Sequence, residues 1–492
     1  MSQSLAVNGC VAACRHFLAV SFRVKCRHSS IRRIAQTFGN RTLSEDLVQP
    51  VKLDISTNPL RLGALLLVFV SGGCGQMKTS SGPAKSPAAA VSNQLAAVTA
   101  AGDPVTLDQL SRMYEEPPVG QNAALIYAQA FAALSADGAN APDFLAHNRE
   151  AVALLLKAAD RPLCRYPVAL TNGITALLPH LSSIRTCATL LRQEAVSQAA
   201  SGDTDAATTA ILAGFRLGRS LDNEPVLVSK LVEIASLQQA LEGLHESLNQ
   251  KSFTDGELLR LQTALSDAEL AVNFRRAILG ERAILVAVFQ SSDEKLAEGM
   301  AATGESNAAA TPSMLSIYRL GGHLEEDFAF ALDFMSKLVE LVDLRYPQAL
   351  DAAAEMKILD TQSVLNQKLV VSAVLLPKPV RFVTTSAEAV ARIRLARTVL
   401  AVEHYRLKHD GALPTSLADL TAELPGGIPE DPFDGQPLRY KALPGRGYTI
   451  YSVGTNRKDD GGIVQGPDVK TPLDVVMTIS RQKIADAINT ND

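Results

Sequence analysis

The sequence predicts a mainly α-helical protein that ends in a small α+β module. Apolar residues recur at three- and four-residue spacing from Gln121 onward, for example at Ala124, Tyr127 and Phe131. Trp is absent and aromatic residues make up only 5%, so the core must be built from Leu, Ala and Val. Short runs rich in aromatic and branched residues, which are typical of strands, occur near the C-terminal end.

Residues 1–59 contain scattered Arg, Cys and Ser without a clear apolar periodicity. Their basic, acid-poor first part superficially fits an organelle transit peptide, but we interpret this stretch as a leader upstream of the true start. That interpretation depends on residues 60–74. There Arg61 precedes an apolar run from Leu62 to Val70, and small residues then lead to Cys74.

The arginine, the short apolar run and the small residues before Cys74 resemble a bacterial lipoprotein signal, with Ser71 where that pattern prefers Leu. The resemblance implies that Cys74 becomes the N-terminus of an exported protein and carries a lipid that anchors it to a membrane. The apolar run is too short for an ordinary membrane span. A plain signal peptide and a buried helix are the alternatives.

Residues 75–103 are dominated by Ser, Ala, Pro and Gly, a composition that cannot bury enough apolar surface to offset the entropy of ordering. We expect a flexible linker here, as a lipid-anchored domain would need. Residues 1–73 carry nine Lys/Arg and three Asp/Glu, whereas the remainder carries 38 and 48. This acidic body argues against a nucleic-acid partner.

Residues 104–355 are expected to form a helical domain, an array or bundle of helical hairpins. A turn at 201–205 between Ala-rich helices is reminiscent of a tetratricopeptide hairpin, but no period of about 34 residues supports a repeat array. A connector at 356–384 precedes the C-terminal module, and a tail at 471–492 follows it. Helices are predicted near 184–200, 205–221, 226–248, 255–270, 271–290 and 325–343, with a polar loop at 291–312.

Residues 385–470 predict a small module of one long helix and a short antiparallel hairpin. Thr385 and Glu388 have the spacing of a capping box, so the helix is expected to run from there to about His409. A Pro-Gly-Arg-Gly turn connects the strands of the hairpin, and a loop rich in Asp, Asn and Gly follows it. The two strands are predicted at 438–442 and 448–453.

Three features of this module are shared with a known family. They are the helix ending in His409-Asp410-Gly411-Ala412-Leu413-Pro414, the segment from Asp431 to Tyr440, and Tyr451-Ser452-Val453-Gly454 before an acidic loop. The module thereby resembles the soluble head of the major pseudopilin of type II secretion systems. The apolar stretch before the helix, residues 369–376, is too short to span a bilayer, so only the head is shared. The order of the predicted segments also resembles that of a group of uncharacterised exported bacterial proteins. This resemblance implies no known activity.

The loop after Val453 is the candidate metal site, and the expected ion is Ca²⁺. Ca²⁺ takes six to eight oxygen ligands, and the loop offers Asn456, Asp459, Asp460 and Asp468. In the pseudopilin family this loop binds calcium, and the resemblance implies that Asn456 and Asp468 occupy ligand positions. Asn456 stands where the family usually has Asp, which removes one negative charge. The alternative is an ordinary solvated turn.

Two cysteines in the predicted exported body are candidates for a disulfide, Cys164 and Cys187. An even pair in an oxidising compartment can form a bridge, and two buried thiols are the equal alternative. Three further cysteines lie in the leader, and no pair of cysteines has the spacing of zinc ligands.

The sequence contains no Gly-rich phosphate loop, no Gly-x-Ser-x-Gly elbow and no His-Glu-x-x-His motif. We therefore expect a non-enzymatic binding or structural protein of the bacterial cell envelope, exported, lipid-anchored and facing the periplasm or the exterior. Its protein partner is unknown. One alternative is an accessory component of a pseudopilus or secretion apparatus. A second is an envelope hydrolase, since catalytic carboxylates need no motif.

Overall fold

The computed structural model describes residues 86–136, 138, 141, 143–302, 310–365, 369–424, 426–464 and 473–480. The predicted leader and the lipoprotein-type signal with Cys74 lie outside these residues, and so does Asp468 of the predicted calcium loop. All described residues fall within one unit and share one hydrophobic core.

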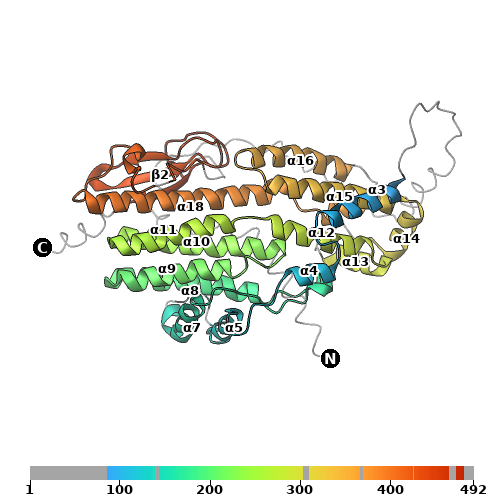
Figure 1. Ribbon diagram of the computed structural model, residues 1–492, viewed down its shortest axis with the longest axis horizontal. Coiled ribbons are helices and arrows are strands. Elements are labelled where there is room, and N and C mark those ends of the chain that lie inside the picture. The colour runs from blue at the N-terminus through green and yellow to red at the C-terminus, as the bar shows by residue number, and fades with distance from the viewer. Residues whose placement is uncertain are drawn as a thin grey trace, which may run out of the picture. The chain divides into compact units, whose positions relative to one another are not determined.

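The described part of the chain is mainly helical and carries a small antiparallel sheet near its C-terminal end, as the sequence predicts (Figure 1). None of its helices has both the length and the apolar character needed to cross a membrane. The α-helices are α3 (Pro87–Ala100), α4 (Leu107–Met113), α5 (Ala124–Ala132), α6 (Phe144–His147), α7 (Arg149–Ala159), α8 (His180–Ser201), α9 (Thr204–Arg219), α10 (Leu227–Gln250), α11 (Asp255–Ala271), α12 (Arg275–Phe289), α13 (Asp293–Ala302), α14 (Pro312–Leu320), α15 (His323–Val342), α16 (Gln348–Leu365), α17 (Val370–Leu375) and α18 (Pro379–Lys408). The 3₁₀-helices are η1 (Leu170–Thr175), η2 (Leu417–Leu420) and η3 (Pro444–Arg446), and the strands are β1 (Arg439–Ala442), β2 (Tyr448–Ser452) and β3 (Val475–Ile479).

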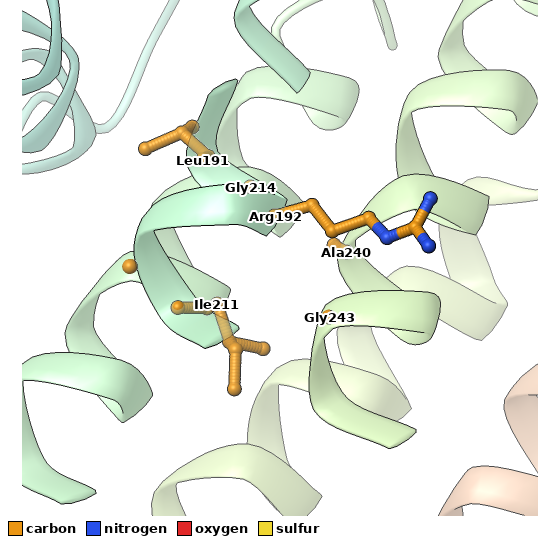
Figure 2. A pocket seen from close by; sticks show the side chains of 8 residues that line it. Leu191, Arg192, Ile211, Gly214, Ala240 and Gly243 are labelled. Carbon is orange, nitrogen blue, oxygen red and sulfur yellow. The ribbon is translucent and has the colours of Figure 1, made fainter. Parts of the chain in front are cut away.

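Small residues allow α8, α9 and α10 to pack closely. Figure 2 shows Gly214 of α9, Ala240 and Gly243 of α10 and the stem of Arg192 of α8 gathered where the three helices meet. A Cβ atom on Gly214 would lie 3.0 Å from the Cβ of Ala240, so a larger side chain would push the helices apart. The volume that a water molecule could occupy at this meeting point is about 0 Å³, which makes it packed core and not a binding site.

The helices predicted from apolar spacing are confirmed, with ends that differ by a few residues. The prediction of a loop at 291–312 is wrong in part, because all of α13 lies within this range. Ser292 lies just before that helix, and its hydroxyl accepts a hydrogen bond from Lys295 N at 3.5 Å. Leu296 and Met300, four residues apart, are both fully buried. Two apolar residues were too few to reveal the helix against a polar background.

The linker expected at 75–103 is also corrected in part, because α3 occupies Pro87–Ala100 and packs against α15. Ser86 caps this helix by accepting a hydrogen bond from Ala89 N, and Pro87 is at its first position. Ala is the best helix former, so the Ala-rich composition that suggested flexibility instead favours a helix once α15 supplies a surface. Val98 becomes buried there.

The long C-terminal helix α18 begins earlier than predicted. Pro379 is its first residue, whereas the capping-box spacing of Thr385 and Glu388 predicts a start six positions later. Thr385 lies inside the helix and its hydroxyl donates to the carbonyl of Arg381 at 3.0 Å. The connector at 356–384 therefore consists largely of the end of α16, all of α17 and the first turn of α18.

The predicted hairpin is present, and a third strand extends it. The strand order is β1-β2-β3 with antiparallel pairing, and Ile450 of β2 lies opposite Tyr440 on one side and Met477 on the other. The strand β3 lies in the region interpreted as a tail at 471–492, which is a further correction. It is also held by the body, because His245 Nε2 and Asn249 Nδ2 of α10 donate to the carbonyl of Thr478 at 2.7 and 3.1 Å.

The helix α18 lies between the body and the sheet. It contacts α10, α11 and α16 of the body and β2 and β3 of the sheet (Figure 1). Buried residues therefore occur on several sides of the helix, among them Ala387, Ile393, Val399 and Ala401. A helix buried on several sides shows no narrow apolar stripe, and α18 belongs to the core of the body as much as to the C-terminal module.

Candidate functional site

The signature segment of the C-terminal module is organised around the buried carboxylate of Asp431, which is 1% exposed. Its Oδ1 accepts hydrogen bonds from Phe433 N at 3.0 Å and from the Ser452 hydroxyl at 2.8 Å. Its Oδ2 accepts from Val453 N at 2.8 Å and from Arg439 Nη1 at 2.7 Å. One carboxylate thus joins the turn before β1 to β1 itself and to the end of β2. We call Asp431 with its partners Phe433, Arg439, Ser452 and Val453 the Asp431 clamp.

The loop after β2 brings together only part of the predicted calcium set. Asn456 Nδ2 donates to Asp460 Oδ2 at 2.7 Å, so these two side chains lie next to each other. Asp459 is engaged elsewhere, since its carboxylate accepts a hydrogen bond from Gly461 N at 2.9 Å. The fourth predicted residue, Asp468, is outside the described residues.

Asp474 is an acidic residue beside this loop that motif spacing does not reveal, because it lies in the stretch predicted to be a tail. Its Oδ2 accepts from Gly462 N at 2.7 Å and from Ile463 N at 3.2 Å. Its Oδ1 is buried and has no hydrogen-bond partner in the described structure. Burial raises the pKa of Asp474, and the neighbouring negative charge of Asp460 acts in the same direction. A cation would satisfy this oxygen.

The described residues include no group of three or more His, Cys, Asp or Glu side chains that are placed to hold one metal ion. Asp460 and Asp474 form the acidic part of the loop site that the structure describes. Carbonyl and amide oxygens also serve as Ca²⁺ ligands, and they would have to supply the remaining positions.

The two cysteines considered for a disulfide are both free thiols, with Cys187 buried and Cys164 half-buried. Burial raises the pKa of each thiol to about 12. A thiol with such a pKa remains protonated at neutral pH and is a poor nucleophile. Both cysteines contribute to the core of the body.

A buried polar network in the body surrounds Glu224, which is 1% exposed. Its carboxylate accepts hydrogen bonds from the Ser229 hydroxyl, from His180 Nε2 at 3.0 Å and from the Tyr114 hydroxyl at 3.3 Å. The Tyr114 hydroxyl in turn accepts from Tyr166 N at 2.9 Å. The network connects α4, the segment before α8, α8 and α10. Its members lie far apart in sequence, so no motif spacing could reveal it.

No protein-family model matches this chain, no curated protein is significantly similar to it, and no solved structure shows significant similarity. The interpretation of its sites therefore rests on the residues themselves. The Asp431 clamp and the Glu224 network are both enclosed by protein partners, which identifies them as parts of the framework.

Proposed function

We propose that this chain is a non-enzymatic binding or structural protein of the bacterial cell envelope, exported and anchored to a membrane through a lipid on Cys74. The observation that carries the proposal is the arrangement of α18 and the sheet. A long helix followed by antiparallel strands that pack on it is the order of elements implied by the resemblance to a pseudopilin head. The packing of α8 on α9 and of α9 on α10 supports a body built as an array of helical hairpins.

Replacing Cys74 by Ala is expected to release the protein from membranes, because the anchoring thiol is removed. The measurement is the distribution of the full chain between the membrane pellet and the supernatant after a high-salt wash of bacterial cells. Cys164→Ala is the matched control and should remain in the pellet. A Cys74→Ala protein that still pellets with membranes would show that the lipid proposal is wrong.

An accessory role in a pseudopilus or secretion apparatus is the second candidate, favoured by the same helix-and-sheet arrangement. The contacts of α18 with α10, α11 and α16 argue for docking through the head and against assembly into the filament, because the helix is already covered. Affinity purification of the full chain from membranes tests this candidate. Recovery of secretion-system components would support it, and their absence would leave the first proposal as the better one.

We also propose that the loop after β2 binds Ca²⁺ through Asp460, Asp474 and Asp468, with Asn456 and main-chain carbonyls as further ligands. Support comes from the unpartnered buried oxygen of Asp474 and from its proximity to Asp460. The amide of Asn456 would have to turn its oxygen toward the ion, because it now donates to Asp460.

Calcium is expected to raise the thermal unfolding midpoint of the full chain in proportion to the logarithm of its free concentration above the Kd. Unfolding is followed by circular dichroism in millimolar calcium and in excess chelator. Asp474→Asn and Asp468→Ala should each abolish the rise, whereas Asp160→Asn, at an exposed position after α7, should not. Identical wild-type midpoints in calcium and chelator would contradict the proposal.

A further inference from the structure

A cavity of about 350 Å³ lies where the body meets the first half of α18. The ends of α11 and α15, the segment between α11 and α12, the segment after α15 and the start of α16 form the rest of its wall. Pockets that bind small molecules in proteins have volumes of roughly 300–1,000 Å³, are mostly apolar and carry a few placed polar groups. This cavity has the size of such a pocket, and both polar and apolar residues line it.

The floor of the cavity is apolar. Phe274, just before α12, and Phe382 of α18 are each 3% exposed, with ring centroids 5.3 Å apart. Val383 and Val390 of α18 also line the floor and are buried. Apolar surface around a cavity large enough for solvent is better covered by an apolar ligand than by water, since that removes the surface from water.

One end of the cavity carries a positive charge. Arg394 Nε donates to Glu269 Oε1 at 2.8 Å, and Arg397 Nη1 donates to Glu269 Oε2 at 2.8 Å. Two guanidinium groups thus share one carboxylate, which leaves one net positive charge. Arg394 Nη1 donates to the carbonyl of Glu430 at 2.6 Å, whereas its Nη2 makes no hydrogen bond within the described residues. Arg394 and its partner Glu269 line the cavity, whereas Arg397 does not.

The other polar groups of the cavity are paired with one another or with neighbouring residues. Asp343 forms an ion pair with Arg275, so this acid adds no net charge. The Tyr346 hydroxyl donates to the Ser386 hydroxyl at 2.7 Å. The site thus combines an apolar floor with one guanidinium nitrogen, Nη2 of Arg394, that has no hydrogen bond within the described residues, and this combination complements a ligand of one negative charge and one apolar chain.

We propose that this cavity binds a small amphipathic monocarboxylate, with its chain over Phe274 and Phe382 and its carboxylate on Nη2 of Arg394. A charge-assisted hydrogen bond between guanidinium and carboxylate is about twice as strong as a neutral one, so an alcohol of the same length is a poorer ligand. A cation is repelled by the net charge. The inference goes beyond the proposed function, because it depends on neither the lipid anchor nor calcium.

The test uses decanoate as the probe, with decan-1-ol and decyltrimethylammonium for comparison, in isothermal titration calorimetry. The protein is the full chain carrying Cys74→Ala, so that no attached lipid competes for the cavity. Decanoate is expected to bind with one-to-one stoichiometry and at least about tenfold more tightly than decan-1-ol, the ratio expected for one charge-assisted hydrogen bond.

Four variants locate the site. Arg394→Gln should remove the preference for decanoate over decan-1-ol, and Arg394→Lys should keep it. Arg381→Gln, an exposed arginine of the same helix that does not line the cavity, should match the parent protein. Leu344→Trp, at a rim residue that is 44% exposed and thus tolerant of replacement, should weaken both ligands by obstructing the mouth.

Four results would overturn the proposal. They are no binding of decanoate, equal or tighter binding of decan-1-ol or of the cation, equal effects of Arg381→Gln and Arg394→Gln, and unchanged binding in the Leu344→Trp protein. None of them bears on membrane anchoring, which the Cys74→Ala fractionation tests separately.

Discussion

Replacing Gly280 by Ala is expected to lower the free energy of unfolding by about 3 kcal/mol or more, at the upper end of the range for overpacked cores. A Cβ atom at this position in α12 would lie 1.8 Å from the carbonyl oxygen of Pro225 and 2.8 Å from its carbonyl carbon. The neighbouring backbone cannot move away freely, because Leu227 N donates to the half-buried Glu281 side chain at 2.9 Å. Urea denaturation of the full chain, followed by far-UV circular dichroism, measures the change.

Gly299→Ala is the matched control, since Gly299 is also a buried helical glycine. A Cβ atom there would lie 3.6 Å from Ile174 Cγ2 and 3.7 Å from Val288 Cγ1, which are ordinary contacts. Ala is a better helix former than Gly by about 1 kcal/mol, so this variant should be neutral or slightly more stable. Equal loss of stability in the two variants would show that the Pro225 contact is not responsible.

Replacing Asp431 by Ala is expected to cost about 3 kcal/mol of unfolding free energy, because it leaves Arg439 and two backbone N–H groups without their buried acceptor. The loss should be concentrated in the C-terminal module. Urea denaturation gives the magnitude, and hydrogen–deuterium exchange gives the place. The amide of Val453, which donates to Asp431 at 2.8 Å, should exchange faster than in the wild-type protein.

Two variants check the role of the Asp431 clamp. Asp431→Asn keeps one acceptor oxygen and should have an intermediate effect. Asp459→Ala, measured in chelator, removes an exposed carboxylate that accepts from a loop amide, and a change within about 0.5 kcal/mol is expected. Unaltered exchange at Val453 in the Asp431→Ala protein would contradict this account of the motif.

The sequence predicts the long helices of the body well, because apolar residues recur along them at three- and four-residue spacing. The period of apolar residues therefore identifies α9, α10 and α12 within a few residues of their ends. The helix α3 is not predicted in this way, because its Ala-rich sequence has no clear apolar stripe. It is stabilised instead by packing against α15. The start of α18 is predicted wrongly for a different reason. A capping-box spacing inside a helix, as at Thr385, is indistinguishable from one at a helix start when only the sequence is read.

The sequence predicts only some of the residues of the candidate metal site, for a related reason. Asn456 and Asp460 lie within one short stretch of sequence, and local spacing identifies them. Asp474 reaches the same place only because β3 pairs with β2 and brings the residue before it beside Gly462. The run from Val475 to Ile479 is rich in β-branched residues, and this composition is the sequence feature that indicates the strand. Pairing partners that are far apart in sequence remain invisible until the fold places them together.

The attachment of β3 to α10 has a consequence for the order in which the chain folds. The elements of the body precede residues 475–479, so the body has its complete sequence while β3 is still unmade. Domains generally fold as they emerge, the N-terminal parts first. On that expectation, the side chains of His245 and Asn249 on α10 lack their Thr478 acceptor until β3 has been synthesised. We therefore expect closure of the sheet to be a late step of folding, and a chain whose synthesis stops before residue 475 to have an unpaired edge at β2.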